Sequence, residues 1–219
     1  MLQLHAATYA TKSHLTFVYS RLQLDQPPAK MCKMLGIGRS TSYKYAKRQS
    51  FESWVAMILF LDTEFTDFHD PELISLALVS ECGRLEFYAE RTDFNRQRCN
   101  EFVLSKVLPK LGQGPSFNSG EFATALLTWL EQVHALDAAS NVLVFYDYDT
   151  DFALLKDALA SSLPAWLEGT NVSGCVNQIS WAREGQEEAP TAHHALHDAH
   201  ELRVDWLASR QILANRLET

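Results

Sequence analysis

The sequence predicts an α/β protein in which helices flank a mixed sheet. Strand-like apolar runs follow one another early in the main part of the chain, and segments with helical apolar spacing dominate later. In addition, 47% of the 219 residues are hydrophobic, which suffices for one ordinary domain with a substantial core. We expect that domain to span 57–219, with 1–56 as a small helical appendage.

Four strands are expected from runs of aliphatic, Val and aromatic residues. The first three are joined by short links, which indicates an antiparallel meander, and the fourth (NVLVFYDY) reads as central and buried. Their expected bounds are 57–62, 73–81, 84–90 and 141–148.

Helices are expected where apolar residues recur at helical spacing. Ser119 is the expected N-cap of a long amphipathic helix, because serine favours that position. The expected helices span 96–111, 119–136, 150–163 and 193–217.

Composition excludes a membrane-spanning protein. The longest uncharged apolar stretch, WVAMILFL at 54–61, is far shorter than the roughly 20 residues that a spanning helix needs. No secretory signal opens the chain, so we expect a cytoplasmic protein without a membrane partner. Its four cysteines have no paired spacing and are expected to be reduced thiols, mostly buried.

The net charge of −8 is unevenly distributed. Residues 1–56 carry eight basic and two acidic side chains, a charge of +6, whereas 57–219 carry 11 basic and 25 acidic ones, a charge of −14. This asymmetry indicates two pieces with different roles.

Two acids, Asp62 and Glu64, stand one residue apart at the end of the first expected strand. Side chains at i and i+2 of a strand point to the same side, so both carboxylates face one place. Because two like charges held that close repel each other, a hard divalent cation is the expected partner.

Two further acidic groups lie at junctions between elements. Asp147, Asp149 and Asp151 stand at a strand-to-helix junction, and His193 and Asp198 open the last helix. Such junctions are where α/β proteins assemble sites. One aspartate of the middle group, with the strand pair and Asp198, would supply four carboxylates, which fit two Mg²⁺ or Mn²⁺ ions roughly 3.5–4 Å apart.

The chain resembles the DEDDh 3′-to-5′ exonucleases, which have an RNase H-like fold. The resemblance covers about 57–205 and rests on three motifs in the family's order: DTEFT at 62–66, DFALL at 151–155 and HHALHDA at 193–199. LEFYAE at 85–90 and the stretch 99–109 are similar to a smaller branch, the bacterial and phage 3′-to-5′ exoribonuclease-like proteins.

The middle motif departs from the family pattern. Asp147 stands where most relatives have an asparagine, four residues before the aspartate. We choose Asp151 as that aspartate because Leu154 and Leu155 then match the family's apolar pair, whereas Asp149 would place an alanine in one of those positions.

The resemblance implies a role for each motif residue. The implied ligands of two metal ions are Asp62, Glu64, Asp151 and Asp198. His193 is implied as the general base, since imidazole titrates near neutral pH. It stands five residues before Asp198, about 140° around a helix, so we expect it in the loop before the last helix. Phe65 and Thr66 are implied contacts of the terminal nucleotide.

These residues favour a metal-dependent 3′-to-5′ exonuclease acting on single-stranded nucleic acid, with RNA preferred over DNA. Related enzymes are often dimers, so a homodimer is a further expectation. The alternative is a nucleic-acid-binding protein with a nuclease-like fold, or a DNA-binding regulator.

Two other metal chemistries are weaker interpretations. His193, His197 and His200 have a spacing that could bind zinc on one helix face, but zinc would leave the strand acids unexplained. The His-Asp pair at 197–198 is also similar to the HD phosphohydrolases, which are all-helical, and the strand around Asp62 argues against them.

The basic front segment predicts two helices around a Gly-Ile-Gly turn within 27–49. This arrangement resembles a helix-turn-helix, and its sequence is similar to the N-terminal module of insertion-sequence transposases; Ser40, Thr41 and Lys44 would then contact DNA. Alternatively, 1–56 is a vestigial leader upstream of a true start at Met57.

Overall fold

The computed structural model describes residues 57–160, 163–176 and 191–218, with side chains described as far as Ile212. Residues Ala56–Ser209 form one compact unit built around a single sheet. The front segment, including the expected DNA contacts Ser40, Thr41 and Lys44, lies outside the described residues.

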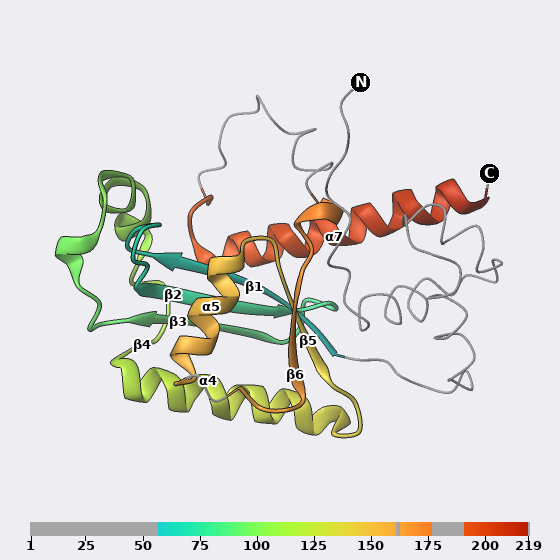
Figure 1. Ribbon diagram of the computed structural model, residues 1–219, viewed down its shortest axis with the longest axis horizontal. Coiled ribbons are helices and arrows are strands. Elements are labelled where there is room, and N and C mark those ends of the chain that lie inside the picture. Colours follow the sequence, from blue (N-terminus) through green and yellow to red (C-terminus); the bar gives the residue numbers. More distant parts are fainter. Residues whose placement is uncertain (1–56, 161–162, 177–190, 219) are drawn as a thin grey trace. The chain divides into compact units, whose positions relative to one another are not determined.

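The sheet has six strands in the order β4-β3-β2-β1-β5-β6 (Figure 1). The strands are β1 (Met57–Phe65), β2 (Leu73–Ser80), β3 (Glu86–Arg91), β4 (Ser116–Phe117), β5 (Val142–Tyr146) and β6 (Leu167–Asn171). β1, β2 and β3 form the predicted antiparallel meander, whereas β5 pairs parallel to β1 and β6 parallel to β5. The sheet is therefore mixed, as predicted.

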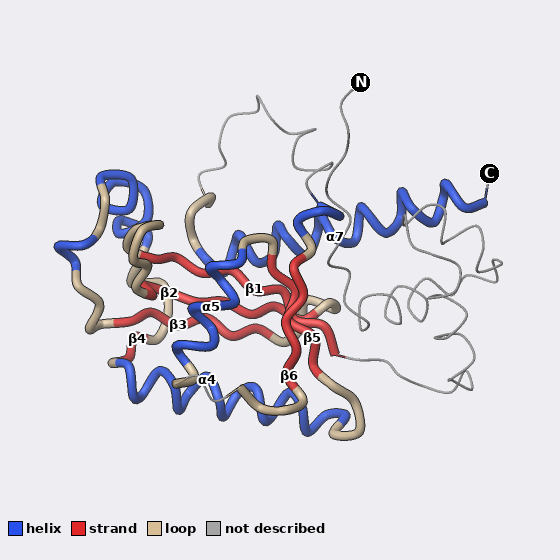
Figure 2. The backbone as a smooth tube through the Cα atoms, in the orientation of Figure 1, coloured by secondary structure: helices blue, strands red, loops and turns tan. Residues whose placement is uncertain are grey.

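The longer helices are α4 (Ser119–His134), α5 (Asp149–Ala158) and α7 (Ala195–Glu218). Short turns η1 (Arg96–Arg98), η2 (Val103–Val107), η3 (Leu108–Lys110) and η4 (Ala135–Asp137) complete the described elements (Figure 2). None of the helices in the described parts of the chain is long and apolar enough to cross a membrane.

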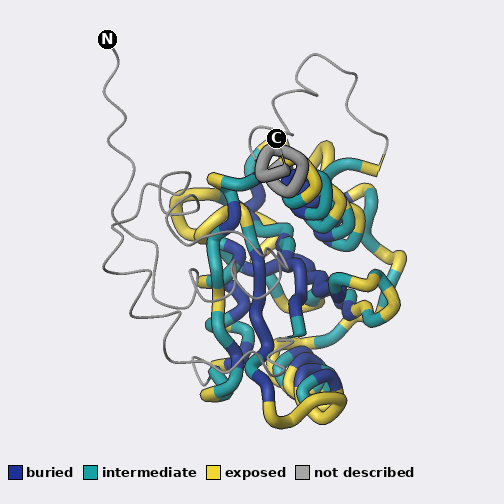
Figure 3. The backbone as a smooth tube through the Cα atoms, turned by 90° about the vertical axis from the view of Figure 1, so that its right-hand side faces the viewer, coloured by how far each residue is buried: buried dark blue, intermediate teal, exposed yellow. Residues whose placement is uncertain are grey.

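Alternation along β1 explains why helices cover both faces of the sheet. Leu59 and Leu61 point into the main core with side chains of α4 and α5. Phe60 points to the other face and meets Phe145 of β5, which in turn meets Trp206 of α7 (ring centroids 5.8 and 5.0 Å apart). The strands are thus buried between two helical layers (Figure 3), and the predicted α/β fold of the RNase H-like kind is confirmed.

The start of α4 differs from the prediction by one residue. The N-cap is Asn118, whose side chain accepts the backbone N–H groups of Gly120 and Glu121, while Glu121 reaches back to the Asn118 N–H. Ser119 instead donates its own N–H to Asp93 (2.9 Å). Ser119 as the cap was therefore wrong, because asparagine caps equally well and completes a capping box here.

The helix predicted over 96–111 is replaced by a chain of short turns. η1 and η3 are 3₁₀ turns, and η2 between them is a π-helical turn. Pro109 lacks the N–H that a continuing helix requires, so a regular helix cannot run through it. The side chains of Val103 and Val107, which are four residues apart, are nevertheless both buried.

The strand β6, with the sequence LEGTN, escaped prediction because it lacks β-branched and aromatic density. It forms because its backbone completes the ladder of β5 in parallel register, from Val142 opposite Leu167 onward. Gly169 permits this close packing, since an added Cβ would lie 2.3 Å from the ring of Phe152 on α5. Tertiary pairing therefore overrides local propensity.

Candidate active site

The site lies where β1 extends beyond the end of its neighbour β5. The parallel pairing ends at Phe60 opposite Phe145, whereas the antiparallel pairing with β2 continues through Asp62 and Glu64. The two acids therefore extend beyond the ladder of β5, on the face that α7 covers. The carboxyl end of a strand beside such a divergence is a common location for ligand sites in α/β sheets.

The first turn of α7 adds a third carboxylate. Asp62, Glu64 and Asp198 each place one oxygen within 4.8 Å of the others, although α7 begins 130 residues after β1 ends. All three are half-buried. The structure thus brings together these three predicted ligands from two elements distant in sequence.

Asp151 approaches the cluster from the first turn of α5. It is 3% exposed, and Thr63 Oγ1 donates to its Oδ1 at 2.6 Å. Its charge raises the pKa values of both Asp62 and Glu64, so it lies within electrostatic reach of the pair. A hydrogen bond from Thr63 fixes the carboxylate beside β1.

Asp149 lies elsewhere. It is exposed at the start of α5, and its Oδ1 accepts a hydrogen bond from Asn171 Nδ2 at 2.7 Å, which directs it toward β6. Asp147 is also exposed, yet its charge adds to the elevation of the Asp62 pKa. Of the three middle acids, Asp151 is the buried one that contacts β1.

Burial and mutual repulsion hold protons on the cluster. Burial, and then the charges of Asp151, Asp198 and Glu64, raise the pKa of Asp62 well above its ordinary value. The same two causes raise the pKa of Glu64 to about 8, with Asp198 as its strongest repelling neighbour. Asp62, Glu64 and Asp198 therefore form one group of carboxylates, and Asp151, outside that group, adds to the repulsion on Asp62 and Glu64.

Burial dominates at the other two acids as well. It raises the pKa of Asp151 to about 7, against the opposing hydrogen bond from Thr63. It raises that of Asp198 to about 6, with a further contribution from Glu201. Hard carboxylate oxygens in this number and charge state fit a divalent cation such as Mg²⁺ or Mn²⁺ better than a softer metal.

His193 lies in the loop before α7, where the spacing of the motif predicted it. Its backbone N–H donates to Asp198 Oδ2 at 2.9 Å, and its ring meets Phe102 edge-on, with centroids 4.7 Å apart. Its φ of 61° lies in the left-handed region that non-glycine residues rarely adopt. Such strain is often found at functional positions.

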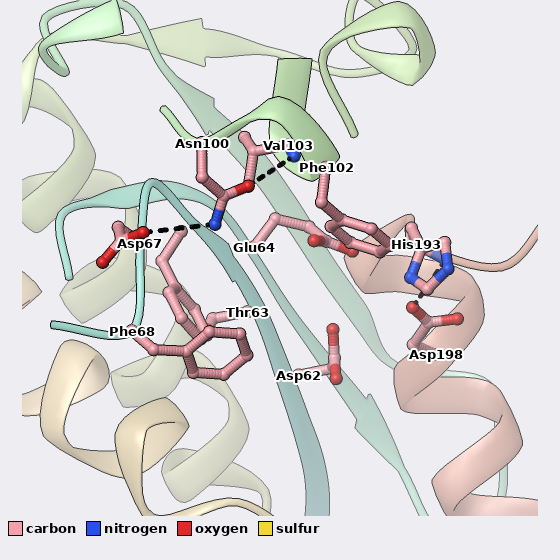
Figure 4. A pocket seen from close by; sticks show the side chains of 11 residues that line it. Asp62, Thr63, Glu64, Asp67, Phe68, Asn100, Phe102, Val103, His193 and Asp198 are labelled. Atoms are coloured by element: carbon pink, nitrogen blue, oxygen red, sulfur yellow. Dashed lines mark hydrogen bonds between the residues drawn. The ribbon is translucent and has the colours of Figure 1, made fainter. Parts of the chain in front are cut away.

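Asp62, Glu64, Asp198 and His193 line a pocket of about 350 Å³ (Figure 4), whereas Asp151 does not line it. Its walls combine the acids with exposed aromatic rings: Phe68 is 68% and Phe102 47% exposed. Phe68 also meets Phe65 edge-on, with centroids 5.1 Å apart. The lining residues are Asp62, Thr63, Glu64, Phe65, Asp67, Phe68, Asn100, Phe102, Val103, His193 and Asp198.

Of the two residues predicted to contact the terminal nucleotide, one lines the pocket and the other does not. Phe65 lines the pocket, but Thr66 does not and is fully buried. The Thr66 hydroxyl accepts the Glu72 N–H at 3.1 Å, and its own N–H donates to the Glu72 carbonyl at 3.0 Å. Thr66 therefore closes the turn after β1.

Six of the pocket residues had no predicted role: Thr63, Asp67, Phe68, Asn100, Phe102 and Val103. Phe68 stands two residues after the first motif, so an aromatic side chain there was the available signal. Asn100 Nδ2 donates to Asp67 Oδ2 at 3.3 Å, and its Oδ1 accepts the Val103 N–H at 2.9 Å. Nothing in the sequence around Asn100 indicates that contact.

The histidine spacing that suggested zinc does not form one helix face. His193 precedes α7, and His200 Nε2 lies 2.9 Å from Glu86 Oε1 of β3. Within the described residues, the group able to hold a metal ion consists of carboxylates. The six-stranded sheet likewise contradicts the all-helical HD phosphohydrolase interpretation.

The fold and the pocket define an α/β protein of the RNase H-like kind with a carboxylate cluster at the end of its central strand. Over 56 residues, the chain is 50% identical to each of two curated proteins named 3′-5′ exoribonuclease, from strains CDC 1551 / Oshkosh and ATCC 25618 / H37Rv of Mycobacterium tuberculosis. The match covers 25% of this chain and 33% of each relative, so it spans a third of the relatives' length. No protein-family model matches the chain.

Proposed function

We propose that this protein is a metal-dependent 3′-to-5′ exonuclease that hydrolyses single-stranded nucleic acid from its 3′ end, with RNA preferred over DNA. The observation that carries the proposal is the convergence of Asp62, Glu64 and Asp198 within 4.8 Å, beside His193 in one pocket. The partial similarity to proteins named 3′-5′ exoribonuclease supports the choice of RNA.

The acidic cluster fits two Mg²⁺ or Mn²⁺ ions. Asp62, Glu64, Asp151 and Asp198 would hold them, because their oxygens are hard donors, and burial first and neighbouring acids second raise the pKa values of these carboxyl groups. Bound ions would supply positive charge that polarises the scissile phosphodiester and offsets charge on the leaving 3′-oxygen.

His193 would act as the general base. It lies in the same pocket as the acids, and its backbone is fixed to Asp198 by a 2.9 Å hydrogen bond. An imidazole in this pocket can accept a proton from an attacking water. Removing His193 should therefore lower the rate of cleavage more than it lowers the affinity for metal.

The aromatic walls suit an unpaired strand end. Nucleobases stack on exposed aromatic rings when they are free of a complementary strand. Phe68 and Phe102 offer such rings on the pocket wall. A pocket of about 350 Å³ is at the small end of the range for small-molecule sites, which favours a single terminal nucleotide over a duplex.

The direct test uses purified protein with 5′-labelled and 3′-labelled single-stranded RNA and DNA of one sequence. We expect a ladder of shortened products from the 5′ label and immediate release of mononucleotide from the 3′ label. Both should require Mn²⁺ or Mg²⁺, stop with EDTA, and proceed faster on RNA. Retention of the strands without metal-dependent cleavage would instead favour the binding-protein alternative.

The change Phe68→Ala tests the aromatic wall. Because stacking contributes about 1–3 kcal/mol per base, we expect KM for single-stranded RNA to rise about 5- to 160-fold with a much smaller change in kcat. Steady-state kinetics on a short labelled oligonucleotide measures both.

Leu136→Ala is the matched control, since Leu136 is a 64% exposed hydrophobic side chain on η4 and does not line the pocket. It should leave KM unchanged. If the Phe68→Ala protein had the wild-type KM, we would conclude that the ring of Phe68 does not contact the substrate.

A further inference from the structure

Residues Arg96–Lys110, here called the arm, connect the two sides of the pocket. At its beginning, the Asn100 N–H donates to the carbonyl of Thr66 at 3.2 Å, just beyond β1. Its middle contributes Phe102 and Val103 to the pocket wall. Its last residue, Lys110, extends to the loop before α7. The arm therefore links the strand that carries two acids to the loop that carries His193.

Lys110 and Asp198 hold the same peptide group from opposite ends. The ammonium of Lys110 donates to the carbonyl of Ala192. The N–H of that peptide group belongs to His193 and donates to Asp198 Oδ2 at 2.9 Å. A peptide group fixed through both its oxygen and its hydrogen cannot rotate without breaking one of the two bonds.

This orientation matters because His193 has an unfavourable backbone conformation. Rotation about the bond between its N and Cα sets φ, which is 61° in the structure. Positive φ is uncommon for a non-glycine residue, so contacts that hold the adjoining peptide group help to keep His193 in this conformation. A change to negative φ would move the imidazole away from Phe102, whose ring lies 4.7 Å from it.

We infer that Lys110 is a positioning residue for His193, acting through the peptide group between Ala192 and His193. This inference rests on the proposed function, in which His193 is the general base. Lys110 itself does not line the pocket. It is half-buried at the end of the arm, where a side chain can hold a loop without contacting the substrate.

The test combines Lys110→Met with His193→Ala. Lys110→Met retains the aliphatic length but removes the donor, so kcat should fall about 10- to 100-fold, as expected for a misplaced catalytic group, with KM nearly unchanged. In the His193→Ala background the same change should cost less than about twofold, because the residue through which it acts is absent. Lys110→Arg, which retains a donor, should recover part of the rate.

Lys106→Met is the matched control, since it makes the same replacement at an exposed lysine of the arm and should leave kcat unchanged. Lys110 also lies close enough to Glu64 to lower its pKa, so its charge could act on the acids directly. An equal loss of rate with and without His193 would point to that electrostatic effect and overturn the inference.

Hydrogen exchange tests the anchor independently of cleavage. In the metal-free protein, Lys110→Met should increase amide exchange over 191–198 about tenfold, while α4 remains protected as in the wild type. Unchanged exchange there would overturn the inference even if the rate fell. A wild-type protein that cleaves no substrate would defeat the proposed function alone, because the exchange result reports on the anchor itself.

Discussion

Asp62→Ala and Asp198→Ala are each expected to reduce cleavage about 10²- to 10³-fold. Asp62 lies at the centre of the cluster, with burial and four other acids raising its pKa, and Asp198 supplies the carboxylate that also holds the His193 backbone. Removing either one takes away preorganised charge that the reaction requires, and losses of about 10²–10³-fold are common for a single such group. Initial rates on labelled single-stranded RNA with Mn²⁺ measure the effect.

A pair of variants of the middle acids provides the matched control. Asp151→Ala should behave like Asp62→Ala, because Asp151 is buried against Thr63 beside the cluster. Asp149→Ala should retain near wild-type rates, because that side chain is exposed and bonded to Asn171. The reverse result, an inactive Asp149→Ala with an active Asp151→Ala, would show that the register chosen from the sequence is wrong.

Local chemistry made the central part of the fold predictable. β1 begins with five apolar residues, and every residue of the mostly apolar β2 is buried, so their hydrophobic pattern identifies them. Asp151 was chosen because Leu154 and Leu155 match the family's apolar pair, and in the structure both leucines are buried in the core while Asp151 lies against β1. In both cases, the residues that identify the element also pack in its core.

Contacts between distant segments explain what the sequence did not reveal. β6 depends on pairing with β5, and the arm depends on anchors such as Asn100 and Lys110, whose partners lie elsewhere in the chain. Single residues of this kind carry no periodic signal. Thr66 is the opposite case. It belongs to a sequence motif and was predicted to contact the nucleotide, but its side chain bonds the backbone of the turn after β1 instead.

Metal-free protein is expected to lose stability as pH rises from 5.5 to 8.5. Unfolded carboxyl groups titrate near pH 4, whereas folding raises the pKa values of Asp198, Asp151 and Glu64 to about 6, about 7 and about 8. Between these limits the folded state binds more protons than the unfolded state, so the free energy of unfolding falls with increasing pH. His194 and Cys82, whose pKa values are lowered, act with the opposite sign within this window, and carboxyl groups with lowered pKa values, such as Asp93, do so below it.

The effect should be visible in thermal unfolding followed by circular dichroism in EDTA. Each kcal/mol corresponds to about 2–4 °C in a domain of this size, so a decrease in Tm of at least about 5 °C is expected across the interval. Mn²⁺ at pH 8.5 should reverse the decrease, because an ion that binds only the folded state at 100 times its Kd adds about 2.7 kcal/mol.

The variant Asp62→Asn distinguishes the contribution of the acidic cluster to the pH dependence of Tm from that of every other titrating group. It removes one of the repelling charges without changing the size of the side chain, so the metal-free variant should melt above the wild type at pH 8.5 and equal to it near pH 5.5, where the wild-type cluster is already largely protonated. It should also gain little from Mn²⁺. Asp149→Asn, an exposed neutralisation bonded to Asn171, should reproduce neither change. Equal Tm values for wild type and Asp62→Asn at both pH values would mean that the four acids do not repel one another in the folded protein, and the argument for a cation among them would then fail.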